Sequence, residues 1–76
     1  MEKEELITTI IDLIKEYGGF VSLTLSCRPY TCIRYNDMKK RYETKCNPTW
    51  DIEIWQSLDE LDRNTLDKIC TDIDFR

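Results

Sequence analysis

The sequence predicts an α+β domain with an N-terminal helix, an antiparallel β-meander of three to four strands, and a C-terminal helix. Apolar residues recur at spacings of three and four near the start, alternate with polar residues after Gly18-Gly19, and regain helical spacing near the end. The chain has 76 residues, a length that suits one domain. We therefore expect residues 1–76 to form a single compact domain, with both helices on one face of the sheet.

The first helix is predicted over residues 3–17. Glutamates at its N-terminal end favour the helix dipole, and Gly18-Gly19 supplies the left-handed backbone that ends a helix. The helical spacing gathers one broad apolar face, made of Leu6, Ile7, Ile10, Ile11, Leu13, Ile14 and Tyr17.

The first strand is expected over Phe20–Cys27, where polar and apolar residues alternate. Arg28-Pro29 interrupts the pattern, and Tyr30–Tyr35 is a second strand rich in β-forming residues. The buried face of the first strand would carry Val21, Leu23, Leu25 and Cys27.

Two further strands are expected after turn signals. Asn36-Asp37 precedes a third strand over roughly residues 40–46. Asn47-Pro48 turns the chain again, and Thr49–Trp55 alternates as a fourth strand.

The two tryptophans lie five residues apart and so point to opposite faces of this fourth strand. Trp50 shares a face with Ile52 and Ile54, which predicts a place in the core. Trp55 either lies on the polar face, as a candidate binding hot spot, or packs under the turn that follows.

The last helix has two candidate starts. Ser57-Leu-Asp-Glu60 fits a capping box, whereas Asp62 could cap a helix that begins one turn later. Leu66, Ile69, Cys70 and Ile73 keep helical spacing with one another. We therefore predict a short turn over 58–61 and a helix from about 63 to 73.

Charge is distributed unevenly along the chain. Residues 1–26 sum to −3 and residues 51–76 to −5, whereas residues 27–50 sum to +4. The candidate basic and aromatic surface consists of Arg34, Tyr35, Lys39, Lys40, Arg41 and Trp55. The candidate acidic surface consists of Asp59, Glu60, Asp62, Asp67, Asp72 and Asp74. The alternative is that the cationic strands neutralise the acidic helices.

Nucleic-acid binding ranks low among the expected functions, because the sequence pI is about 4.7. The order of helix, three strands and helix resembles the double-stranded-RNA-binding domain. That family presents lysines at the start of its final helix, where residues 59–64 here read Asp-Glu-Leu-Asp-Arg-Asn. The resemblance is therefore one of topology alone.

Catalysis is not expected, because the chain has no histidine to act as a general base. Asp37, Glu43 and Lys45 form a D-x5-E-x-K pattern used by metal-dependent nucleases, but an exposed charged strand is the favoured explanation. Asp51 and Glu53 are expected on a solvated strand face. We predict no enzyme activity, no cofactor and no metal.

The four cysteines, Cys27, Cys32, Cys46 and Cys70, lack the two close pairs typical of a structural zinc site. Buried thiols are the expected state, with a bond between Cys27 and Cys32 the arrangement to check. The chain shows neither a secretory signal nor an apolar stretch of membrane-spanning length, which predicts a cytoplasmic location without membrane contact.

Two segments carry a family resemblance: the acidic helix that ends in Tyr17-Gly-Gly-Phe-Val-Ser-Leu, and the ending Ser57-Leu-Asp-Glu-Leu-Asp…Leu66-Asp-Lys-Ile69. They resemble small uncharacterised proteins encoded by gut bacteria, their phages and mobile elements. The resemblance implies a phage or mobile-element accessory protein.

We expect a non-enzymatic protein-interaction module that binds a protein partner or self-associates. The alternatives are an acidic inhibitor of a nucleic-acid-binding host-defence protein, as anti-CRISPR proteins are, and, third, nucleic-acid binding through the basic meander.

Overall fold

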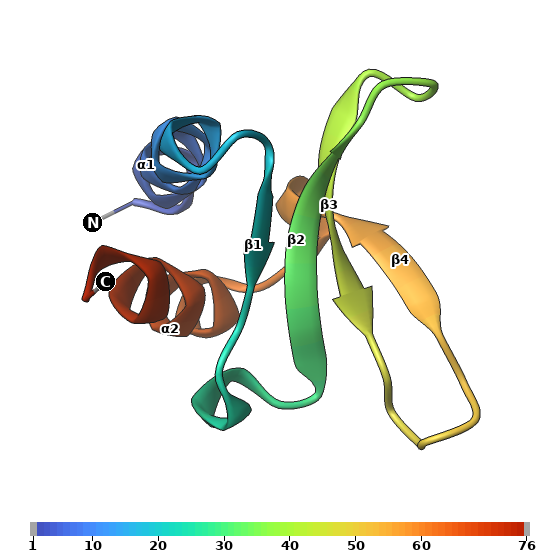
Figure 1. Cartoon of the computed structure of the whole chain (residues 1–76). Coiled ribbons are helices and arrows are strands. Elements are labelled where there is room, and N and C mark those ends of the chain that lie inside the picture. The colour runs from blue at the N-terminus through green and yellow to red at the C-terminus, as the bar shows by residue number, and fades with distance from the viewer. Residues whose placement is uncertain (1, 76) are drawn as a thin grey trace.

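The computed structural model describes residues 2–75 and has a four-stranded sheet beside two helices (Figure 1). The chain order is α1 (Lys3–Glu16), β1 (Phe20–Ser22), a 3-10 turn (Leu25–Cys27), β2 (Tyr30–Asn36), β3 (Arg41–Cys46), β4 (Ile54–Ser57), a second 3-10 turn (Leu58–Glu60) and α2 (Arg63–Asp74). The predicted α+β class, with a helix at each end of an antiparallel meander, is confirmed.

The sheet has the strand order β1-β2-β3-β4, and each strand runs antiparallel to its neighbour. Val21 pairs with Ile33, which pairs with Thr44. A bulge at Thr31 shifts the register at the start of β2. Successive side chains on a strand point to opposite faces, so this register fixes which residues share a face.

Both helices lie on the same side of the sheet (Figure 1). Val21 and Ile33 face that side, since they belong to one core cluster with residues of both helices. Each helix places one apolar stripe against the sheet and against the other helix. The buried core consists of Leu6, Ile10 and Ile14 of α1, Leu66, Ile69 and Ile73 of α2, and Val21, Cys27, Ile33, Leu58 and Leu61.

The helix boundaries agree with the pattern of the sequence. α1 ends where Gly18 and Gly19 adopt φ values of 81° and 93°, and the Gly19 amide donates to the Ile14 carbonyl at 3.0 Å. α2 begins after Asp62, whose side chain accepts from the Thr65 amide at 2.8 Å. The later of the two predicted starts is therefore confirmed.

The prediction of one strand over Phe20–Cys27 is wrong beyond Ser22. β1 ends there, Leu25 is 73% exposed, and the chain turns toward α2. Thr24 is held there because its hydroxyl and amide both donate to the Asp72 carboxylate, at 2.5 and 3.2 Å. This contact between residues far apart in sequence outweighs the local alternation.

The core placement of Trp50 is also wrong. Residues 47–53 form a loop, and pairing with β3 begins only at Ile54, opposite Cys46. The Asn47 side chain donates to the Ile52 carbonyl at 3.0 Å and stabilises this loop. Trp50 is consequently 95% exposed.

Within residues 2–75, no helix is long and apolar enough to cross a membrane.

Candidate functional site

The open face of the sheet, opposite the helices, carries a row of polar and charged side chains. Arg34 pairs across the strands with Glu43, which pairs with Ser57. The neighbouring row contains Lys45 and Trp55. Cross-strand neighbours of this kind lie close enough for their side chains to interact.

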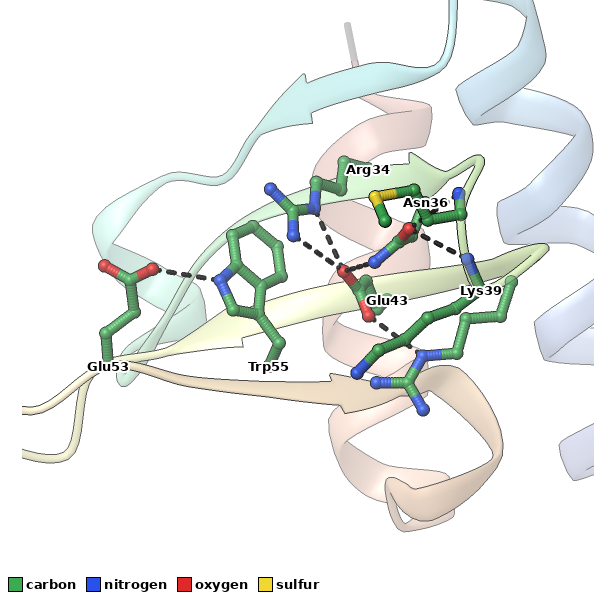
Figure 2. A network of polar contacts seen from close by, with 8 residues as sticks. Arg34, Asn36, Lys39, Glu43, Glu53 and Trp55 are labelled. Atoms are coloured by element: carbon green, nitrogen blue, oxygen red, sulfur yellow. Dashed lines mark hydrogen bonds and ion pairs between the residues drawn. The ribbon is translucent and has the colours of Figure 1, made fainter.

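Glu43 is the centre of this face, as Figure 2 shows. Its Oε1 accepts from Arg34 Nε at 3.0 Å and from Asn36 Nδ2 at 2.9 Å, and its Oε2 accepts from Arg41 Nε at 2.9 Å. The Glu43 side chain is 0% exposed. Both carboxylate oxygens are thus engaged by donors on β2 and β3.

These donors determine how Glu43 titrates. Burial alone would raise the pKa of Glu43, but the hydrogen bonds from Asn36, Arg41 and Arg34, together with the charge of Arg34, lower it below the ordinary value. Glu43 is therefore a charged structural group that two arginines neutralise.

Trp55 lies beside this network on the polar face, one of the two placements expected from the sequence. The Arg34 guanidinium lies 3.7 Å from the centroid of its ring, and Lys45 Nζ lies at 5.9 Å. Its Nε1 donates to Glu53 Oε1 at 2.9 Å (Figure 2). Trp55 is half-buried, with the Arg34 guanidinium over one face of its ring.

The candidate basic and aromatic surface is not a single patch. Arg34, Arg41 and Trp55 share the open face, whereas Tyr35 points to the helix side and packs on Tyr42 with ring centroids 4.9 Å apart. Lys39 and Lys40 lie in the β2–β3 turn, where Lys40 pairs with Asp37 at 3.2 Å. The two arginines are engaged by Glu43.

Half of the candidate acidic surface has a local structural role. The Asp59 carboxylate accepts from the Ser57 hydroxyl, Asp62 caps α2, and Asp72 holds Thr24. Hydrogen bonds from Ser57 and from Thr65 lower the pKa of Asp59 and of Asp62, respectively.

The other three acids of that surface, Glu60, Asp67 and Asp74, are exposed. Asp67 and Asp74 flank Cys70, whose thiol pKa is raised by burial and then by these two charges. The six acids therefore do not share one role.

The D-x5-E-x-K residues do not form a metal-binding cluster. Asp37 lies in the β2–β3 turn with Lys40, Glu43 is surrounded by arginines, and Lys45 lies beside Trp55. In residues 2–75, no group of three or more His, Cys, Asp or Glu side chains could hold a metal ion.

The four cysteines are thiols, with no disulfide between them in the described chain. Cys27, Cys32 and Cys46 are buried and Cys70 is half-buried. Burial raises the thiol pKa of Cys46 above its ordinary value.

A second exposed surface is an apolar arm, which we define as Trp50, Ile52 and Ile54 of the β3–β4 hairpin. Ile52 and Ile54 are each 45% exposed, and Trp50 projects almost wholly into solvent. A surface hollow of about 440 Å³ lies beside Trp50, between Pro29 and Asn47. The arm thus combines exposed apolar side chains with a concave neighbour.

The sequence predicts a core position for Trp50 because the alternation of apolar residues in this segment is typical of a buried strand. Turn-forming residues on both sides of Trp50 are the signal that could have revealed the arm. The Thr49 hydroxyl donates to Asp51 at 2.7 Å around this tryptophan.

Comparisons with protein-family models, with curated proteins and with solved structures found no match for this chain.

Proposed function

We propose that this chain is a non-enzymatic protein-interaction module that contacts its partner through the apolar arm. The observation that carries the proposal is the exposure of three large apolar side chains within five residues of one hairpin. A domain of this size needs most of its apolar side chains for its core, so it has few that it can leave exposed without a function. Exposed tryptophan is also a residue type enriched at the energetic centre of protein interfaces.

The open face of the sheet supports nucleic-acid binding less well. Its two arginines donate to the buried carboxylate of Glu43, and Arg34 also covers one face of the Trp55 ring. A phosphate would have to compete with that carboxylate, and a base could not stack on the covered face. Nucleic-acid binding therefore ranks below protein binding.

An acidic inhibitor of a cationic partner surface is the second candidate function. It is favoured by the charge around the arm, since the chain contains four acids and no Lys or Arg between Lys45 and Asp62. A phage or mobile-element setting stays a prediction from the sequence resemblance, and the neighbouring genes test it.

Site-specific photo-crosslinking tests the module. A photoreactive phenylalanine analogue is placed at position 50 in the cells that make the protein, with the same analogue at position 38 as the control. Met38 is the matched site, because it is also 95% exposed but lies in the other hairpin turn. We expect a discrete protein adduct from position 50 that Ile52→Asp abolishes.

Equal adducts from positions 50 and 38, or none from position 50, would contradict the proposed role of the arm. If nucleic acid co-purified with the protein through Arg34 and Arg41 and was lost at high salt, that result would instead support nucleic-acid binding.

A further inference from the structure

The β4 strand lies at the open edge of the sheet. It pairs with β3 and, within residues 2–75, with no other strand (Figure 1). The edge of a sheet presents backbone N–H and C=O groups that another extended segment can bind. At the other edge, β1 has only three residues and is followed by the turn that Asp72 holds.

Carboxylates outnumber cations around the β4 edge. Asp51 and Glu53 precede the strand, Asp59 and Glu60 follow it, and all four are exposed. The nearest cations are engaged by other groups. Arg41 is bound to Glu43, Lys45 lies near Trp55, and the Lys3 ammonium donates to the Asp59 carbonyl at 2.6 Å.

The side chains at this edge are suited to an alternating partner strand. Ile54 and Trp55 are consecutive and point to opposite faces of the sheet. Ile54 therefore offers apolar contact on the helix side, and Ile52, which is also exposed, precedes it in the loop. In strand addition, backbone hydrogen bonds provide affinity while alternate side chains provide specificity.

We infer that the β4 edge binds an extended segment of a partner protein in which Lys or Arg alternates with apolar residues. The segment would add a fifth strand, its cations facing the four carboxylates. This inference rests on the proposed interaction function and names the chemistry of the partner. A second copy of this chain is disfavoured as the occupant, because pairing two β4 edges would bring like charges together.

A peptide titration tests the inference. The probe is an acetylated, amidated eight-residue peptide that alternates lysine and valine, added to the ¹⁵N-labelled full chain. We expect saturable binding with amide shifts in Ile54–Ser57 and the loop over 47–53. A peptide with glutamate in place of lysine should bind at least about tenfold more weakly. N-methylation of alternate peptide amides should also weaken binding, since it removes donors to the edge.

Charge-removing variants supply a matched comparison. The double variant Asp51→Asn with Glu53→Gln removes two charges near the edge, and the amide oxygen of Gln can still accept from Trp55. The control, Glu4→Gln with Glu5→Gln, removes two exposed charges from α1. We expect the first to weaken binding of the lysine–valine peptide about fivefold and the control to leave it unchanged.

Equal binding of the lysine and glutamate peptides, or shifts confined to other elements, would overturn the inference. Concentration-dependent dimerisation with shifts in β4 would also overturn it, because the occupant would then be a second copy. If any of these results were found together with a specific crosslink from position 50, the proposed interaction function would stand. Only the β4 edge would be excluded as the binding site.

Discussion

The two faces of the sheet exclude water by different means although the same strands build them. On the helix side, Ile33 and Thr44 pair with each other and are 0% exposed. On the open face, Glu43 is equally buried although no helix covers it. Apolar packing closes the first face, whereas arginines and an asparagine close the second around a carboxylate.

This difference shows that burial on a thin domain need not mean apolar packing. The helix side gains free energy from apolar area removed from water, a gain that does not depend on the charge state of any residue. The open face depends on Glu43 remaining ionised. The two faces should therefore respond differently to truncation and to pH.

The largest expected effect is from Ile33→Ala on the helix side. Removing this buried side chain should lower the free energy of unfolding by about 2–5 kcal/mol, because it loses apolar burial and leaves a cavity. Urea unfolding followed by circular dichroism measures the change. The control is Ile54→Ala at the exposed edge, expected within about 0.5 kcal/mol of the parent. Equal losses from both variants would contradict the proposed core.

On the open face, Glu43→Gln should lower the free energy of unfolding by about 1–3 kcal/mol at pH 7, because two arginines lose a charged acceptor. The same urea titration measures it. Asp37→Asn removes the carboxylate of an exposed pair, whose side chains are 72% and 83% exposed, and should leave stability unchanged. If Glu43→Gln left the free energy of unfolding unchanged, the hydrogen-bond network around Glu43 would contribute no stability.

The pH dependence of this difference should separate the faces further. Glu43 has a lower pKa in the folded chain than the ordinary value of about 4.3 that applies when unfolded. Its ionisation therefore stabilises the fold above that value, and the contribution is lost as pH falls through the folded pKa.

The stability gap between the parent and Glu43→Gln should consequently narrow as the pH falls below about 5. Asp59 and Asp62 also have lowered pKa values, but they are present in both proteins and cancel in the comparison. The corresponding gap for Ile33→Ala should stay constant over the same range. A constant gap for Glu43→Gln would contradict its lowered pKa.

The smallest expected effect concerns the ring beneath Arg34. Trp55→Leu keeps an apolar side chain but removes the contact with the guanidinium, and should lower the free energy of unfolding by about 0.5–1 kcal/mol. Trp50→Leu is the matched control, with no expected change because its ring is exposed. Denaturant titrations of both variants provide the test. A larger loss of unfolding free energy from Trp50→Leu than from Trp55→Leu would contradict the placement of Trp55 against Arg34 and of Trp50 in solvent.

The helices could be predicted from the sequence because their signals are local. Apolar spacing defines the buried face of α1, glycines end it, and Asp62 starts α2. The end of β1 could not be predicted, because Thr24 is held by Asp72 from a distant part of the chain.

The candidate sites were predicted less well for the same reason. Arg41 shares a face with Glu43 by strand alternation, but Arg34 meets Glu43 only through the pairing of β2 with β3, which no linear spacing shows. Trp50 has the alternation of a core residue, yet hydrogen bonds within its loop keep it outside the sheet.

The sequential order of the strands has a consequence for the entropy of folding. Each strand pairs with the next along the chain, so the sheet forms by closing short loops, whereas docking of α1 on α2 brings the two ends of the chain together. The Lys3 ammonium donates to the Asp59 carbonyl across 56 positions. Since each doubling of loop length costs about 0.6 kcal/mol, closing that loop costs about 2 kcal/mol more than closing a four-residue turn. The contacts of α1 with the C-terminal third of the chain thus carry a larger loop-closure cost than the strand pairings. The meander that presents β4 and the arm depends mainly on short-range closures.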